Sequence, residues 1–243
     1  MISSVIDHVA IAVPDRQPAI KRYLGHFGGG SVASGRRAGF TIDQVSFSRG
    51  TKLEIVGPDP KSEDRRRTND FLKKYGSVIH HVTVLVESVG DAVSTLEAAG
   101  VHPVGIRLDD PRYQEAFVLP QQGGGVMVQI TWKDVDDAGW AQRYGHTPTP
   151  PQPYCPDFIG VRWSQPNLGE ISEQWRILGG DVSMNHGVLS VSWGSDCLRF
   201  EYVEGEPRGL EELIFEGAPT LPSSIDTGPA VVPVGRARSN LGA

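Results

Sequence analysis

A short apolar segment occurs twice in this chain, and the repeat restricts the possible folds more than any other sequence feature. Residues 6–13 read IDHVAIAV and residues 79–86 read IHHVTVLV, so each copy has a histidine at its third position. β-branched residues dominate both copies, which is typical of buried or half-buried strands. His8 and His81 therefore occupy equivalent places in two related strands, 73 residues apart.

A second pair of segments repeats at nearly the same spacing. Residues 52–56 read KLEIV and residues 127–131 read MVQIT, which places Glu54 and Gln129 75 residues apart. Two unrelated coincidences would not share a spacing so closely. We infer an internal duplication with one metal-capable side chain at each of four equivalent places.

Each copy has the same predicted order of elements, one strand, one helix and three more strands. Residues 17–27 and 89–99 have apolar residues at helical spacing, and glycine follows each segment as a stop signal. The later strands of the two copies are predicted at residues 31–37, 40–48 and 51–56, and at residues 101–108, 114–119 and 125–132. We expect an α+β fold in which two βαβββ modules pair and their sheets curl into one cup.

The proposed domain limits follow from breaks in this pattern. Residues 1–133 form the predicted metal-binding domain, with modules at 1–60 and 76–133. A linker with a proline-rich end covers residues 134–155, and a third, degenerate βαβββ-like module covers residues 156–216. Residues 217–243 are rich in Gly, Pro, Ser and Ala, which predicts an extended tail.

The third module does not repeat the metal-capable residues. Gly160 stands at the position that matches His8, whereas Glu201 matches Glu54. A lone carboxylate cannot hold a metal, so this module is interpreted as structural or dimerising. Because it has no partner module within the chain, we expect it to pair with its copy in a homodimer.

The alternation of strand side chains indicates how the repeated residues could meet. His8 shares its strand face with Ala10 and Ala12, whose small side chains leave room for a ligand. In a paired cup, four side chains would converge on one divalent cation, either Zn, Fe, Co, Ni or Mn; they are His8, Glu54, His81 and Gln129.

Composition excludes several other classes of protein. A net charge of −6 argues against a nucleic-acid or anionic-membrane partner, and no apolar run has membrane-spanning length. The N-terminus lacks the pattern of a signal peptide. Two cysteines, Cys155 and Cys197, suit reduced thiols, so a cytoplasmic location is expected.

Residues 4–133 resemble the vicinal oxygen chelate superfamily, which includes glyoxalase I, extradiol dioxygenases and methylmalonyl-CoA epimerase. The local resemblance is closest to the epimerases, in segments 6–15, 51–58, 71–81 and 116–129. The resemblance implies the metal ligands His8, Glu54, His81 and Gln129. The epimerases commonly have a glutamate where this chain has Gln129.

The resemblance also implies a chemistry, in which the ion stabilises an enolate-like anion and a carboxylate moves the proton. We therefore expect an isomerase, epimerase or lyase acting on a small carbonyl or acyl-CoA-like substrate. Glu54 could be both ligand and base, and Asp43 is a second candidate base, although it lies one place off the preferred register.

Two alternatives use the same cup. His8, His81 and Glu54 make a two-histidine, one-carboxylate set, which suits an Fe(II) dioxygenase of the ring-cleaving type. A non-enzymatic protein of the resistance type would only sequester a small molecule, because fold does not determine function.

Overall fold

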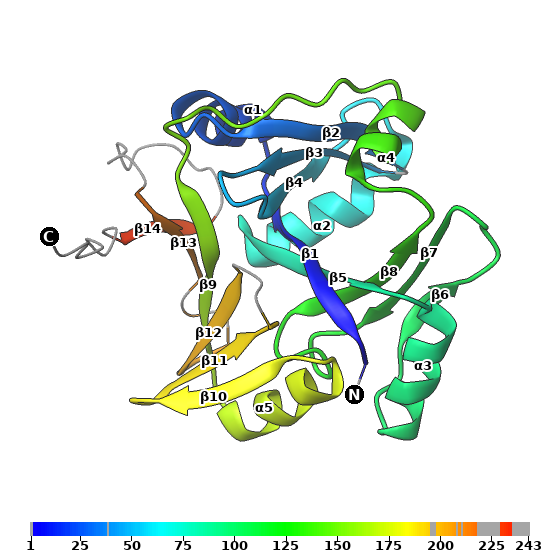
Figure 1. Cartoon of the computed structure of the whole chain (residues 1–243), viewed down its shortest axis with the longest axis vertical. Helices are drawn as coiled ribbons and strands as arrows, with labels where there is room; N and C mark the ends of the chain where they lie inside the picture. The colour runs from blue at the N-terminus through cyan, green and yellow to red at the C-terminus, as the bar shows by residue number, and fades with distance from the viewer. Residues whose placement is uncertain are drawn as a thin grey trace, which may run out of the picture.

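The structure is a computed structural model that describes residues 2–37, 39–194, 198–207, 209, 211–217 and 229–234. Within these residues the strands form one eight-stranded and one six-stranded sheet (Figure 1). Cys197 and most of the expected tail lie outside the described residues.

The first unit has the predicted order of elements. They are β1 (Ser4–Ala12), α1 (Arg16–Ile20) with the π-helical turn η1 (Lys21–His26), β2 (Gly30–Arg37), β3 (Phe40–Ser46) and β4 (Lys52–Pro58). Asp15 begins the helix because its side chain accepts a hydrogen bond from the backbone N–H of Gln17.

The second unit repeats this order after a short helical connection. The connection is η2 (Glu63–Arg65) and α2 (Arg66–Tyr75), and the unit consists of β5 (Val78–Val86), α3 (Val89–Ala98), β6 (Val104–Arg107), β7 (Tyr113–Val118) and β8 (Met127–Lys133). Ser88 caps α3 by accepting from the N–H of Asp91.

The two units pair through their first strands into one sheet of order β2-β3-β4-β1-β5-β8-β7-β6. β1 and β5 are antiparallel to each other, and each also pairs in parallel with the last strand of its own unit, β4 or β8. The sheet is therefore internally symmetric, and the predicted α+β arrangement of paired βαβββ modules is confirmed.

Side-chain alternation separates the two faces of this sheet. Val9 and Ile11 are fully buried in the main core, whereas Ala10 packs in a separate cluster with Ile42 and Val56. That second cluster lies on the face that also carries His8, and we call this face the cup.

The third unit forms most of the six-stranded sheet. Its elements are β9 (Asp157–Gln165), α5 (Leu168–Ile177), β10 (Asp181–Asn185), β11 (Val188–Ser192), β12 (Arg199–Glu204), β13 (Glu211–Glu216) and β14 (Ala230–Val234), in the sheet order β10-β11-β12-β9-β13-β14. This unit extends its own sheet beyond β9, which the sequence did not predict. β13 pairs antiparallel with β9, and β14 pairs in parallel with β13, as β5 and β8 do beside β1.

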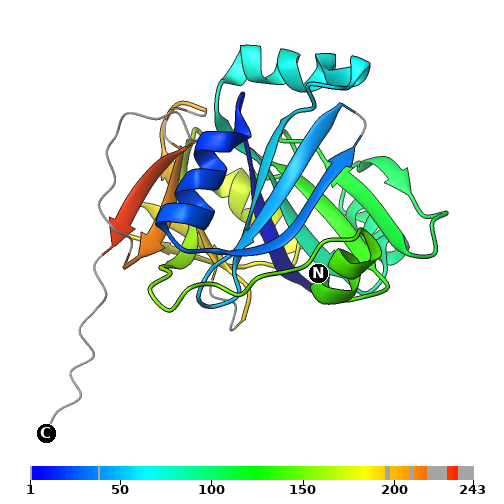
Figure 2. The same cartoon turned by 90° about the horizontal axis from the view of Figure 1, so that it is seen from above.

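One apolar core joins the two sheets. Five fully buried aromatic side chains contact one another edge to face, tilted or stacked; they are Tyr23, Phe27, Phe47, Phe158 and Phe215. The linker contributes a helix, α4 (Asp137–Arg143), and then runs beside β2, where the N–H groups of Thr149 and Gln152 donate to Ser31 and Gly28 (Figure 2).

Candidate metal centre

Three of the four residues inferred to bind metal lie together on the cup face. Nε2 of His8 is 3.7 Å from Oε2 of Glu54, and Nε2 of His81 is 3.9 Å from Oε1 of the same carboxylate. Each of the three residues offers a donor atom within 4.8 Å of the others, and all three are buried. Two imidazoles and a carboxylate at this spacing are suitable ligands for a first-row divalent cation.

Strand register brings these residues together. Ala10 of β1 is the partner of Glu54 across the parallel pair and of His81 across the antiparallel pair. His8 is two residues from Ala10 and therefore shares its face. Because Ala10 has only a methyl group, the carboxylate and the imidazoles can approach each other above it.

A β-bulge precedes each histidine, and the two bulges are themselves duplicated. The register of β1 with β5 skips residue 7 on one strand and residue 80 on the other, which lie 73 positions apart like the histidines. Oδ2 of Asp7 is 2.6 Å from Nδ1 of His8, and Nδ1 of His80 is 2.8 Å from Nδ1 of His81. Each bulge residue thus holds Nδ1 of the next histidine and leaves its Nε2 directed at Glu54.

Burial and local charge set the protonation of these groups. Burial lowers the pKa of His81 well below its usual value, and His80 and His8 lower it further, so the neutral imidazole that a metal requires is favoured. Burial alone would raise the pKa of Asp7. The hydrogen bond and charge of His8 and the charges of Lys52 and Lys133 outweigh burial and hold that pKa well below the usual range.

Gln129 adjoins the cluster through its amide oxygen. Thr83 donates to Oε1 of Gln129 at 2.8 Å, and the same hydroxyl lies 3.0 Å from Nε2 of His8. Nε2 of Gln129 donates to Oε2 of Glu115 at 2.7 Å and to the hydroxyl of Tyr113 at 3.0 Å. These two acceptors orient the amide so that its oxygen, the atom able to bind a metal, faces the histidines.

Asp43 is not part of this site, which corrects its place among the candidate bases. On β3 it is Gln44 that pairs with Glu54, and Nε2 of Gln44 donates to Oε2 of Glu54 at 2.9 Å. Asp43 therefore points to the opposite face of the sheet, where its carboxylate forms an ion pair with Arg16. A shift of one residue reverses the face of every side chain in a strand.

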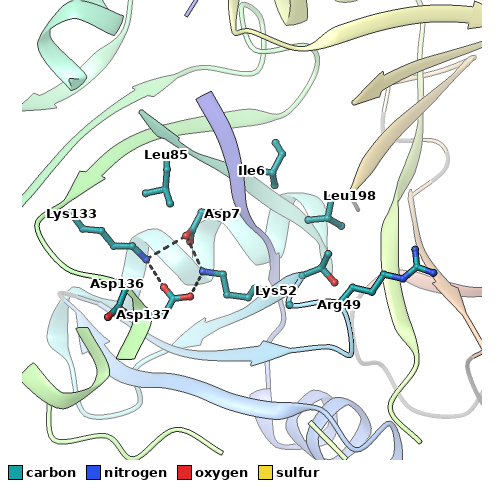
Figure 3. Close-up of a pocket in the computed structure, with 11 residues that line it drawn as sticks. Ile6, Asp7, Arg49, Lys52, Leu85, Lys133, Asp136, Asp137 and Leu198 are labelled. Atoms are coloured by element: carbon teal, nitrogen blue, oxygen red, sulfur yellow. Dashed lines mark hydrogen bonds and ion pairs between the residues drawn. The ribbon is translucent and has the colours of Figure 1, made fainter. Parts of the chain in front are cut away.

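A cavity of about 500 Å³ is lined by Asp7, which adjoins His8 in the chain, and by Lys52, which lies two residues before Glu54 (Figure 3). Its wall contains an ion network in which Lys52 and Lys133 both contact Asp7 and Asp137. Burial would lower the pKa of Lys133, but the charges of Asp7 and Asp137 raise it above the usual value. Asp137 is the first residue of α4, so the linker helix is attached to the cup by this network.

The remainder of α4 lies across the cup. The rings of Trp140 and Tyr113 are 5.3 Å apart, and Trp140 also lines a small cavity with Ile42 and Tyr144. The structure thus places linker residues, for which the sequence predicted no contact with the site, against Tyr113 and near Ile42 on the cup face.

The six-stranded sheet carries a contrasting cluster at the equivalent positions. Arg162 is the strand partner of both Glu201 and Glu212, just as Ala10 is the partner of Glu54 and His81. Nη2 of Arg162 is 2.6 Å from Oε2 of Glu201, and Nη1 is 3.4 Å from Oε2 of Glu212. A guanidinium group there occupies the place that a metal ion would take in the first sheet.

The place of His8 in this second sheet is sterically closed. A Cβ on Gly160 would lie 2.2 Å from the carbonyl oxygen of Arg199, so no side chain fits without a backbone shift. The third unit therefore cannot present an imidazole at that point.

Comparison with known proteins agrees with this geometry. Residues 7–117 match the family model of the Glyoxalase/Bleomycin resistance protein/Dioxygenase superfamily. The matched segment contains His8, Glu54 and His81, and the resemblance of the sequence to this superfamily is confirmed over it. No curated protein matches the chain.

Solved structures extend the likeness in fold. A hypothetical protein from Staphylococcus aureus is 11% identical, with a TM-score of 0.68, and the match covers 96% of this chain and 100% of that one. A hypothetical protein from Bacillus halodurans is 23% identical, with a TM-score of 0.48, over 55% of this chain and 97% of that one. Methylmalonyl-CoA epimerase from Mycobacterium tuberculosis is 24% identical, with a TM-score of 0.46, over 55% of this chain and 91% of that one.

Among the described residues, no helix combines the length and the apolar character needed to cross a bilayer.

Proposed function

We propose that this protein is a metal-dependent isomerase, epimerase or lyase that acts on a small carbonyl or acyl-CoA-like substrate. One observation carries the proposal, namely that Nε2 of His8 and Nε2 of His81 lie within 4 Å of the Glu54 carboxylate on one buried face. The superfamily match and the local likeness of the sequence to epimerases support the same reaction class.

His8, His81 and Glu54 would hold the cation, and Gln129 would supply a fourth ligand through Oε1. A bound divalent cation would supply Lewis-acid stabilisation of the negative charge that develops on the substrate oxygen. Asp7 and His80 keep the two imidazoles in the orientation that ligation requires.

Glu54 is the residue placed to move the proton. Its Oε2 accepts a hydrogen bond from Nε2 of Gln44, which restrains one oxygen of the carboxylate on the cup face. A carboxylate among neutral ligands can take a proton from the carbon beside a carbonyl and return it to the other face. Asp43 has no such role, because its strand face is the wrong one.

A homodimer and a cytoplasmic location remain predictions. β13 pairs with β9 where a partner module would lie, as β5 lies beside β1, so a second copy of the chain would have to pair elsewhere. Light scattering of the purified protein would decide the oligomeric state.

The first test concerns the metal. Elemental analysis of the purified protein should find one transition-metal ion per chain, and a His8→Ala, His81→Ala double variant should contain none. His102→Ala is a matched control, because His102 is exposed and lies outside the cluster. An equal metal content in the double variant and the wild type would refute the proposed site.

The second test concerns the reaction. NMR in D2O should show exchange of the proton beside the carbonyl in a panel of acyl-CoA thioesters and 2-oxo acids, at the same rate with and without oxygen. Turnover that consumes oxygen would instead support the Fe(II) dioxygenase, which the two-histidine, one-carboxylate set favours. Stoichiometric binding without exchange would support the non-enzymatic binder.

A further inference from the structure

The ion network beside the metal centre has a geometry that suits an exchangeable carboxylate. Nζ of Lys52 is 2.7 Å from Oδ2 of Asp137, and Nζ of Lys133 is 2.5 Å from Oδ1 of the same residue. One carboxylate therefore bridges two ammonium groups, with one oxygen on each.

The four members of the network differ in exposure. The side chains of Lys52, Lys133 and Asp7 are 8%, 14% and 6% exposed, whereas that of Asp137 is 39% exposed. Asp7 is also fixed by its hydrogen bond to His8. Asp137 is thus the one member of the network that a change of side-chain rotamer could release into solvent.

Release of Asp137 would leave a charge that requires a partner. Two ammonium groups, each about nine-tenths buried, would then face the single carboxylate of Asp7. An uncompensated buried charge is costly, so an anion from solvent would be drawn to the position that Asp137 had filled. The cavity of about 500 Å³, which both lysines and Asp137 line, provides the space for it (Figure 3).

We propose that Lys52 and Lys133 form a carboxylate-binding subsite of the metal centre, which the side chain of Asp137 fills in this structure. Asp7 connects the two, because it contacts Lys52 through Oδ1 and His8 through Oδ2. As a substrate subsite it rests on the proposed function. It specifies the substrate class as a small molecule that has a carboxylate in addition to the oxygen that the metal would bind.

The test is chemical rescue of an Asp137→Ala variant of the full chain. Thermal unfolding is followed as sodium acetate is added, with sodium chloride at the same ionic strength as the control. We expect acetate, at about ten times its dissociation constant, to raise the Tm of the variant by about 3 °C above the chloride value. The wild type, in which Asp137 fills the subsite, should show no such difference, and neither should an Asp137→Ala, Lys133→Met variant.

An Asp137→Ala protein that responds to acetate no more than the wild type does would overturn the proposal. Rescue by inorganic phosphate but not by acetate would overturn the assignment of a carboxylate. If Asp137→Ala does not fold, Asp137→Ser replaces it, because serine suits the start of a helix, removes the charge and leaves room for acetate. Metal content is measured on the same samples, so failure of the subsite is distinguishable from failure of the metal centre.

Discussion

Replacing Asp7 with asparagine tests how the duplicated bulges prepare the metal centre. The carboxylate of Asp7 accepts from Nδ1 of His8 at 2.6 Å and contacts Lys52 and Lys133 at 2.9 and 3.4 Å. Asparagine keeps the size and an acceptor oxygen, so the imidazole can stay in place. The substitution removes the negative charge of Asp7, which makes Nε2 of His8 a stronger donor to a metal ion.

Two magnitudes follow from these contacts. Loss of a residue that orients a metal-binding histidine typically costs 10–100-fold in metal affinity, which is about 1.4–2.7 kcal/mol. Removal of one partner from a buried ion network costs about 3–5 kcal/mol of unfolding free energy. Both effects should therefore be measurable, the first by competition with a chelating indicator for Zn²⁺ and the second by urea unfolding.

Asp43→Asn is the matched control. Asp43 also pairs with a cation, Arg16, but on the opposite face of the sheet. The Asp43→Asn variant should have a lower free energy of unfolding than the wild type and the same Zn²⁺ affinity. The reasoning is refuted if Asp7→Asn binds Zn²⁺ within threefold of the wild type, or if Asp43→Asn weakens binding as strongly.

Three other changes test separate features of the structure. Glu115→Leu should lower Zn²⁺ affinity about tenfold in the same competition assay, because Gln129 loses the carboxylate acceptor that orients its amide; unchanged affinity would exclude this role. Gly160→Ala should cost about 1–3 kcal/mol in urea unfolding because its Cβ would meet the backbone at 2.2 Å, whereas Gly169→Ala, near the start of a helix and with no atom closer than 3.6 Å, should cost nothing. Burial raises the pKa of Cys155 to about 11, so about one thiol in a thousand ionises at pH 8, and peptide mass spectrometry should find Cys155 unmodified by iodoacetamide in the native protein. Because this folded-state pKa is above the value of 9.0 expected when unfolded, its contribution to stability should fall as the pH rises from about 9 to about 11.

The sequence was sufficient to predict the paired modules and the residues that gather in the cup. The nearly equal spacing of His8 from His81 and of Glu54 from Gln129 reveals the duplication in a single sequence. The alternation of side chains along each strand then indicates which residues share the cup face. Asp43 shows the limit of this approach, because an error of one residue in the predicted register moves a side chain from the cup face to the opposite face of the sheet.

The bulge residues could not be predicted from alternation, because a bulge interrupts it. Alternation alone would place Asp7 and His80 on the faces opposite their neighbouring histidines, yet both side chains reach Nδ1 of those histidines. Asp7 and His80 have the same spacing in the sequence as the two histidines. One sequence alone, however, does not distinguish a bulge residue from an ordinary strand residue. The contact of α4 with the cup and the pairing of β13 with β9 depend on long-range packing, which no local pattern encodes.

The guanidinium of Arg162 has a consequence for how the molecule would respond to metal starvation. In the six-stranded sheet the positive charge between Glu201 and Glu212 is covalently part of the chain, so it is present from the moment of synthesis. In the eight-stranded sheet the matching charge would be supplied by the proposed cation. Chelation of the proposed cation should therefore leave the carboxylate of Glu54 without a compensating charge, whereas Glu201 and Glu212 keep theirs.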